Sequence, residues 1–323
     1  MTEALEKKQS LFVKKLFKDY RIPLLAVVVF IVVSIIRPRF VSTYNLFTLF
    51  DAIPGYGIAA VGLTFVLLCG QLDISIGSVM ALSSCVFMMM LKNGSPFVLA
   101  MLVALLIGAC CGAVTGFFIS TFRLSPFIVS MTMQLICKGI ALTITHSTPV
   151  AYQHPTLVAI SDMKLGPIPI TMLLFLLVVF IAYFVMRKTQ YGRNLYVIGG
   201  NINVADNLGL NVRMHLWSIF IIQGFCSALG GLCLMTRQFS ASGNLAIDGI
   251  MTIIPMVIVG GTMFSGGKGD SIKTLYGAVL MEIIYNAMAM FNMGANMQKM
   301  LRGLILLIII VSDKYIENRK YKV

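Results

Sequence analysis

The sequence predicts an all-α integral membrane protein with about ten transmembrane helices and both termini in the cytosol. Of its 323 residues, 58% are apolar and only 11% are charged, and the mean hydropathy is +0.91. A soluble domain cannot hide that much apolar surface, because its exterior needs polar cover. The apolar residues also occur in runs of roughly 20, the length of helix that crosses about 30 Å of hydrocarbon.

The expected spans follow these runs in order. The first, 22–40, comes after a basic segment (1–21) and is followed by no small-x-small cleavage site, so we expect an uncleaved helix with a cytosolic lead-in along the lipid surface. The other spans are expected near 46–68, 72–91, 97–119, 126–146, 168–186, 214–235, 246–264, 272–292 and 298–312. They form one transmembrane domain, 22–312, with a cytosolic tail over 313–323.

The lysines and arginines behind the net charge of +13 are not gathered in one cluster but are expected mainly on one side of the membrane. With the N-terminus inside, most of the 25 lysines and arginines fall in cytosolic segments, mainly the first 21 residues, the polar segment 187–213 and the C-terminal tail. This bias favours topology and contact with anionic lipid over nucleic-acid binding. Because both termini come out cytosolic, the number of spans should be even.

Cysteine and histidine show no pattern of metal ligation. The seven cysteines fall in or at the ends of apolar spans without a C-x-x-C, and the three histidines have no ligand spacing. Cysteine in such a setting is a small buried hydrophobe. We therefore expect neither a metal site nor disulfides.

Small residues mark close helix packing. Gly108, Gly112 and Gly116 share one helix face in the fourth span, and a similar stripe begins at Gly224 in the seventh. Residues four apart without bulky side chains let another backbone approach closely. A static contact is the favoured interpretation, and a sliding seam is the alternative.

A carboxylate interrupts the apolar pattern between the second and third spans. Asp73 lies between Gly70 and Gly77, and two serines, Ser75 and Ser78, follow it. A charge near hydrocarbon is retained where it is paired, wet or capping a helix. We expect Asp73 to cap the third span at a helix break near the cytosolic face, with direct ligand contact as the alternative.

A second glycine-rich segment, 259–269, superficially resembles a phosphate-binding loop. It lacks the Walker A pattern, which needs Gly at 262 and Ser or Thr after the Lys, so we expect no nucleotide site. A tight cytosolic turn between two helices, with a helix-break or gating role, fits better. Its glycines are Gly260, Gly261, Gly266, Gly267 and Gly269.

Enzyme chemistry has no support in the sequence. It holds no nucleophile–base pair, no paired carboxylates in one short motif and no H-E-x-x-H. Few acidic residues fall well within or against the spans, Asp73 and Glu282 among them, which leaves little for an ion-driven carrier.

Several motifs occur together in one order. They are Asn45-Leu46, Gly62-x-Thr64-Phe65-Val66, Gly70-x-x-Asp73-x-Ser75-x-Gly77-Ser78, Pro126-Phe127-Ile128-Val129, Gly166-x-x-Pro169, Gly192-Arg193-x-Leu195-Tyr196-x-Ile198-Gly199-Gly200-Asn201, Gly209-x-Asn211-Val212, Gly260-Gly261-Thr262 with Gly266-Gly267-x-Gly269, and Gln298-x-x-x-Arg302-Gly303. From about Phe40 to Ser312 the chain thereby resembles the membrane permease subunit of bacterial ATP-binding-cassette (ABC) importers for simple sugars, the ribose, xylose, arabinose and galactose permease family.

The resemblance implies a subunit of a larger machine in the bacterial inner membrane. Such permeases pair as homodimers or heterodimers, an external binding protein delivers the sugar, and a cytosolic ATPase uses ATP and Mg, so that this chain would bind no cofactor itself. Segment 199–212 resembles the helix that docks on the ATPase, where Asn201 would cap a short helix and Gly209 would end it. The residues so assigned to coupling are Gly199, Gly200, Asn201, Asn203, Ala205, Asp206, Gly209 and Asn211.

The chain departs from the family in ways that bear on its partners. Ile202-Asn203-Val204-Ala205 stands where the family usually has Pro-Glu-Ala-Ala, which indicates a dedicated ATPase. An ABC permease for branched-chain amino acids or nucleosides, an ion-coupled secondary carrier and a membrane protein without transport remain alternatives.

Polar side chains inside the spans are candidates for the substrate pathway. In a helical bundle such groups either join helices or line a pore, and both interpretations stay open. The most informative candidate is Lys138, because an ammonium group inside a span needs an anionic partner or water. The set is Thr64, Gln134, Lys138, Thr143 and Asn286.

Overall fold

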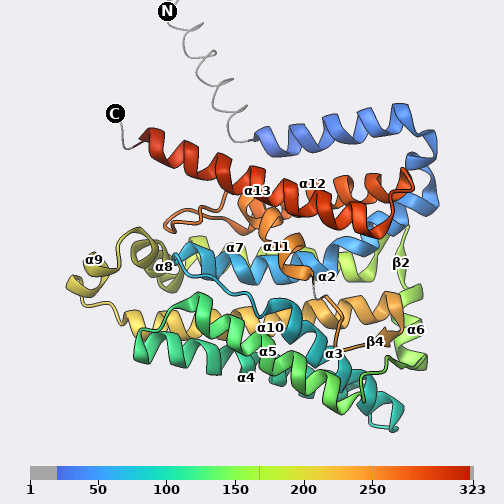
Figure 1. The fold of residues 1–323 in the computed structure, drawn as a ribbon, viewed down its shortest axis with the longest axis horizontal. Helices are drawn as coiled ribbons and strands as arrows, with labels where there is room; N and C mark the ends of the chain where they lie inside the picture. The colour runs from blue at the N-terminus through green and yellow to red at the C-terminus, as the bar shows by residue number, and fades with distance from the viewer. Residues whose placement is uncertain (1–19, 167, 247, 321–323) are drawn as a thin grey trace, which may run out of the picture.

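The computed structural model describes residues 20–166, 168–246 and 248–320, with backbone alone over 313–320. Nearly antiparallel helices form one bundle (Figure 1). The helices are Tyr20–Ile36, η1 (Pro38–Val41), α2 (Thr43–Leu68), α3 (Ile76–Lys92), α4 (Phe97–Phe122), α5 (Pro126–Ile144), α6 (Pro155–Asp162), α7 (Ile170–Lys188), α8 (Gln190–Gly200), α9 (Ile202–Asn207), α10 (Val212–Gln238), α11 (Gly249–Val259), α12 (Ser271–Met290) and α13 (Ala295–Lys320). Two-residue strands pair antiparallel, β1 (Val150–Ala151) with β4 (Ser240–Ala241) and β2 (Lys164–Leu165) with β3 (Ile168–Pro169).

The prediction of an all-α membrane protein is confirmed. Within the described residues, six helices are long and apolar enough to cross a membrane, namely α2, α4, α5, α7, α10 and the Ala295–Ser312 part of α13. The chain is therefore a multi-pass membrane protein. A helix overlaps each of the ten expected spans, whereas the number of crossings and the side of the termini stay predictions. Most of the expected N-terminal lead-in lies outside the described residues.

Two expected spans were wrong at their starts. α3 begins at Ile76 rather than 72, and α11 has 11 residues where 246–264 had been expected. Eleven residues span roughly 16 Å of helix, about half the hydrocarbon thickness. The two helices begin side by side, because Gly77 lies against the backbone oxygen of Ala246 and close to Gly249. Hydropathy alone could not distinguish these interrupted helices from continuous ones.

The centre of the bundle is held by small residues. α10 packs along α2, α3 and α4. Gly108 of α4 lies against Ala228 and the backbone of Gly224, and Gly112 lies against the carbonyl oxygen of Phe220. The two stripes that were separate in the sequence are thus the two sides of one contact, as the favoured static interpretation requires.

Polar side chains in the core join helices to one another. Asn45 and Asn286 exchange two hydrogen bonds of 3.0 and 3.1 Å between α2 and α12. The hydroxyls of Thr64 and Thr274 lie 2.8 Å apart between the same two helices. Asn286 is 8% exposed and Thr64 is fully buried, and each already has a hydrogen-bond partner on the other helix, so in this conformation both of these pathway candidates join helices.

Replacing Gly112 with leucine should destabilise the bundle. Its new side chain would meet the backbone of Phe220, which cannot rotate away, so we expect a loss of about 1–3 kcal/mol or more. Thermal unfolding in detergent measures this as a lowered midpoint. Gly139→Leu in α5 is the matched control, because a Cβ there meets nothing within 4 Å. Equal midpoints for the two variants would contradict the packing described.

Candidate coupling segment

The polar segment 187–213 folds into two short helices at one end of the bundle, called here the coupling end (Figure 1). α9 begins where expected, since the Asn201 side chain accepts bonds of 2.9 and 3.2 Å from the amides of Asn203 and Val204. It ends at Asn207, and Gly209 follows at φ 73°. The left-handed backbone at Gly209 explains why a glycine ends this helix.

The side chain of Asn211 then caps α10 by accepting a bond of 3.0 Å from the Met214 amide. Each polar residue at these turns therefore satisfies backbone donors that a helix start leaves free. The segment is consequently folded into capped helices rather than an irregular loop.

At its C-terminal end α8 approaches the bundle backbone to backbone. Gly199 lies against the Leu68 carbonyl at the end of α2 and against the Gly267 amide. Gly267 in turn donates 2.8 Å to the same Leu68 oxygen. A Cβ on Gly266 would lie 2.7 Å from the Gly199 oxygen and 2.8 Å from the Gly70 amide. Three glycine motifs far apart in the sequence thus meet at one point, named here the glycine contact (Gly70, Gly199, Gly266 and Gly267).

A polar link reinforces the glycine contact. The Arg187 guanidinium donates to Asp270 at 2.7 and 3.0 Å, and Asp270 also caps α12 by accepting 2.9 Å from the Ile272 amide. The hydroxyl of Tyr196 in α8 donates 2.7 Å to the Gly269 carbonyl. Burial raises the pKa of Tyr196, so its phenol stays protonated at neutral pH and keeps donating.

α8 is also fixed to α10. Tyr191 stacks on His215 with ring centroids 5.4 Å apart, and its hydroxyl lies 2.6 Å from Ser218. Burial raises the pKa of Tyr191 to about 12, so this phenol also stays neutral.

α9 by contrast presents its side chains outward. Ala205 is buried and anchors the helix, whereas Val204 and Leu208 are 48% and 66% exposed. Asn203 and Asp206 are exposed as well. A rigid helix with exposed apolar side chains at the tip of a membrane protein fits a docking element.

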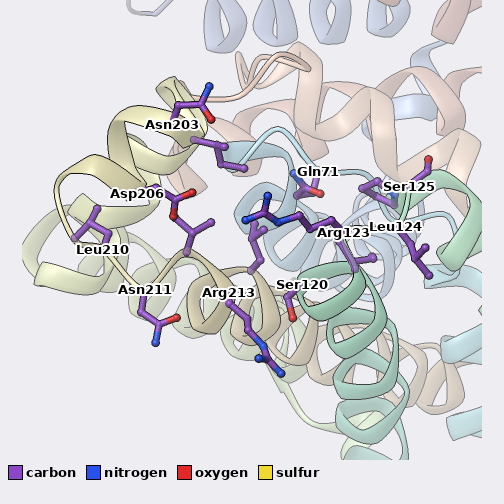
Figure 2. A pocket seen from close by; sticks show the side chains of 15 residues that line it. Gln71, Ser120, Arg123, Leu124, Ser125, Asn203, Asp206, Leu210, Asn211 and Arg213 are labelled. Carbon is purple, nitrogen blue, oxygen red and sulfur yellow. The ribbon is translucent and has the colours of Figure 1, made fainter.

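Beside α9 lies a groove of about 500 Å³ between the coupling segment and the corner that joins α4 to α5 (Figure 2). Asn203 and Asp206 line one wall, and Gln71 and Arg123 face them. Arg123 has a left-handed backbone (φ 52°) and extends into the groove. The groove lies between α9 and the corner of α4 and α5, so the side of α9 that faces the groove does not pack against these two helices.

The helix break at 69–75 differs from the expectation at Asp73. Asp73 accepts bonds from the Ser75 amide and hydroxyl at 2.8 and 2.6 Å, but the residue that precedes α3 is Ser75, so Asp73 stabilises the turn rather than capping the helix. It is 3% exposed and lies within electrostatic range of Cys111 and Cys137 of α4 and α5, so it is buried in the bundle. Its place near the cytosolic face stays a prediction.

The turn expected at 259–269 is present and joins α11 to α12. Gly261, Gly266 and Gly267 have φ values of 92°, 85° and 72°, a backbone region that side chains disfavour. Gly260 packs against the backbone of Lys273, and Gly269 packs against Thr262. A gating role for these glycines stays a prediction.

The remaining pathway candidates lie on α5. Thr143 is exposed and bonds the Gly139 carbonyl of its own helix at 2.8 Å. Gln134 and Lys138 are half-buried, and among the described residues no ion pair reaches Lys138. The sequence had also missed the links made by Arg187, Tyr196 and Asp270, since their partners lie far away in the chain.

Comparison with known proteins identifies the family of this chain. A family described as "Branched-chain amino acid transport system / permease component" matches residues 45–310. The chain belongs to this permease family. No solved structure is significantly similar to it.

Similar proteins include permeases named for sugars. The permease is 29% identical to a ribose import permease of Haemophilus influenzae over 91% of this chain and 92% of the relative. It is 30% identical to a D-allose transport system permease of Escherichia coli over 98% of both chains. An autoinducer 2 import permease of Photorhabdus laumondii is 27% identical over 91% of this chain and 90% of the relative. The resemblance to sugar ABC importers is thereby confirmed.

Gly199 and Gly200 are neighbours in the sequence, but only Gly199 belongs to the glycine contact. Gly199→Ala should lower the thermal midpoint of the permease by several degrees, because the methyl group would overlap the Leu68 carbonyl. Gly200→Ala should leave the midpoint unchanged or raise it slightly, since a Cβ there meets nothing within 4 Å. Both are measured by thermal unfolding in detergent. A Gly199→Ala protein as stable as the wild type would exclude the close backbone approach.

Proposed function

We propose that this chain is the permease subunit of an ABC importer for a simple sugar, a pentose, a hexose or a related small polyol. It would act in the bacterial inner membrane as one of two permease subunits, with an external binding protein that delivers the sugar and a cytosolic ATPase that uses ATP and Mg. The observation that carries the proposal is α9, a capped helix with exposed side chains that is joined, through α8 and the glycine contact, to the turn before α3 and the turn after α11.

The contacts define a route for force. A displacement of α9 by a docked ATPase passes to α8 across Asn201, and from α8 to the glycine contact. There it reaches Leu68, which precedes the 69–75 turn into α3, and Gly267, which belongs to the turn that follows α11. Because packed backbones resist compression, the shift is transmitted rather than absorbed.

The substrate class is inherited from the relatives. Those reported above are named for ribose, D-allose and autoinducer 2, which supports a small hydroxylated substrate. The family description names branched-chain amino acids instead, so a permease for these amino acids is the second candidate. An ion-coupled carrier is disfavoured by membership in a family of transport-system permease components.

Docking is tested at Gly200 and Asn201. Replacing both with leucine should leave membrane insertion intact yet abolish ATP-dependent uptake and co-purification of the ATPase, because bulky side chains at the start of α9 block the docked partner. Gly200 is exposed and a Cβ there meets nothing within 4 Å, whereas leucine at 201 also removes the side chain that caps α9. Uptake of labelled sugar into proteoliposomes and a detergent pulldown provide the two readouts.

Asn201→Ser is the matched control, since serine also caps a helix and adds no bulk. It should keep both uptake and ATPase binding. Uptake by the double-leucine variant at the wild-type rate would count decisively against α9 as the docking element.

A further inference from the structure

A group of polar side chains lies near the middle of the bundle and has no place in the coupling segment. This central polar cluster consists of Tyr56 in α2, Glu282 and Tyr285 in α12, and Arg302 in α13. Tyr56, Glu282 and Tyr285 each lie within electrostatic range of Arg302. Charged groups inside a membrane bundle are costly and usually mark a substrate path or a proton relay.

Glu282 has unused hydrogen-bonding capacity. Within the part of the chain that the structure describes, no hydrogen bond or ion pair to its carboxylate is formed. Its two cationic neighbours are Arg237 and Arg302, and Arg237 already lies 3.8 Å from Asp51. The residue as a whole is partly exposed.

Tyr285 is more deeply buried and also lacks a partner. It is 4% exposed, and its hydroxyl makes no hydrogen bond among the described residues. The Arg302 guanidinium lies over its ring, 4.6 Å from the centroid, and one Arg302 nitrogen lies 3.4 Å from the Thr252 hydroxyl. The Nε of Arg302 is buried without a partner. Buried donors without partners are rare, because each costs free energy until something bonds it.

The cluster borders the point where the two broken helices begin. A Cβ on Gly249, the first residue of α11, would lie 3.5 Å from the Tyr56 ring and 3.8 Å from Gly77 of α3. No side chain caps α11, because Asp248 pairs instead with Lys299 at 2.8 Å. The free amides at this helix start add donors beside the cluster.

We propose that the central polar cluster contacts a neutral, hydroxylated small molecule on the translocation pathway, an inference that rests on the importer function above. The Glu282 carboxylate accepts hydrogen bonds from hydroxyls, the Arg302 Nε donates one, and the Tyr285 hydroxyl does either. The half-exposed ring of Tyr56 packs on C–H groups of the ligand. The negative charge of Glu282 and the positive charge of Arg302 balance each other. A neutral ligand preserves this balance, whereas a charged ligand would add a charge without a counter-charge.

The test uses the complete importer, with its ATPase and binding protein, in proteoliposomes. Labelled D-ribose, D-allose, a series of monodeoxyriboses and L-leucine are the probes. Glu282→Gln and Tyr285→Phe keep shape while changing one hydrogen-bonding group. Each should lower ribose uptake about tenfold and reduce the preference for ribose over the deoxyribose that lacks the contacted hydroxyl. The binding protein is the same throughout, so a changed preference arises in the permease.

Tyr44→Phe and Asp162→Asn are the matched controls, since both residues are exposed and lie outside the cluster. They should match the wild type, and all variants should retain the ATPase on purification. Wild-type uptake by the two cluster variants would overturn the site, as would an equal loss for every sugar, which indicates a structural or subunit contact. A wild-type importer that takes up leucine but no sugar would instead refute the proposed function itself.

Discussion

The structure depends most on the approach of three backbones at the glycine contact. Leu68 at the end of α2, Gly199 in α8 and Gly267 in the turn after α11 lie so close that no side chain fits at Gly199. Side-chain contacts can repack when elements shift, whereas a backbone contact with a 2.8 Å hydrogen bond across it moves as one body. Under the proposed function, such a contact would let the coupling segment act directly on the helices of the bundle.

The turns at this contact lead into α3 and out of α11, two helices that begin within the bundle. α3 and α11 begin beside each other at Gly77 and Gly249. The turns on which they depend, 69–75 and 260–270, both attach to the glycine contact. Both helices are thus joined directly to turns of the glycine contact. Under the proposed importer function, a rigid-body shift at the coupling end would reach these two helices, which suits alternating access around a central site.

Polar groups in the bundle fall into two kinds. Asn45 with Asn286, and Thr64 with Thr274, satisfy each other and join α2 to α12. Glu282 and Tyr285 lie on the same α12 yet have no such partners among the described residues. Bonded pairs stabilise one helix arrangement, whereas unsatisfied groups gain free energy from a ligand. The distinction is one of pairing, not residue type, which is why a list of polar residues within spans does not identify a pathway.

The sequence by itself determined the features that depend on composition and local backbone chemistry. Apolar runs gave the helical membrane class, Asn201 and Gly209 gave the bounds of α9, and the glycines of 260–267 gave a turn. Only the tertiary structure decided that Gly70, Gly199 and Gly266 meet, that Asp73 is buried in the bundle, and that Thr64 and Asn286 are already bonded. Caps and turns depend on residues that are close in the sequence. Hydrogen-bond partners and burial depend on which helices pack together, and these lie far apart in the sequence. The hydropathy of the sequence does not specify which helices are in contact.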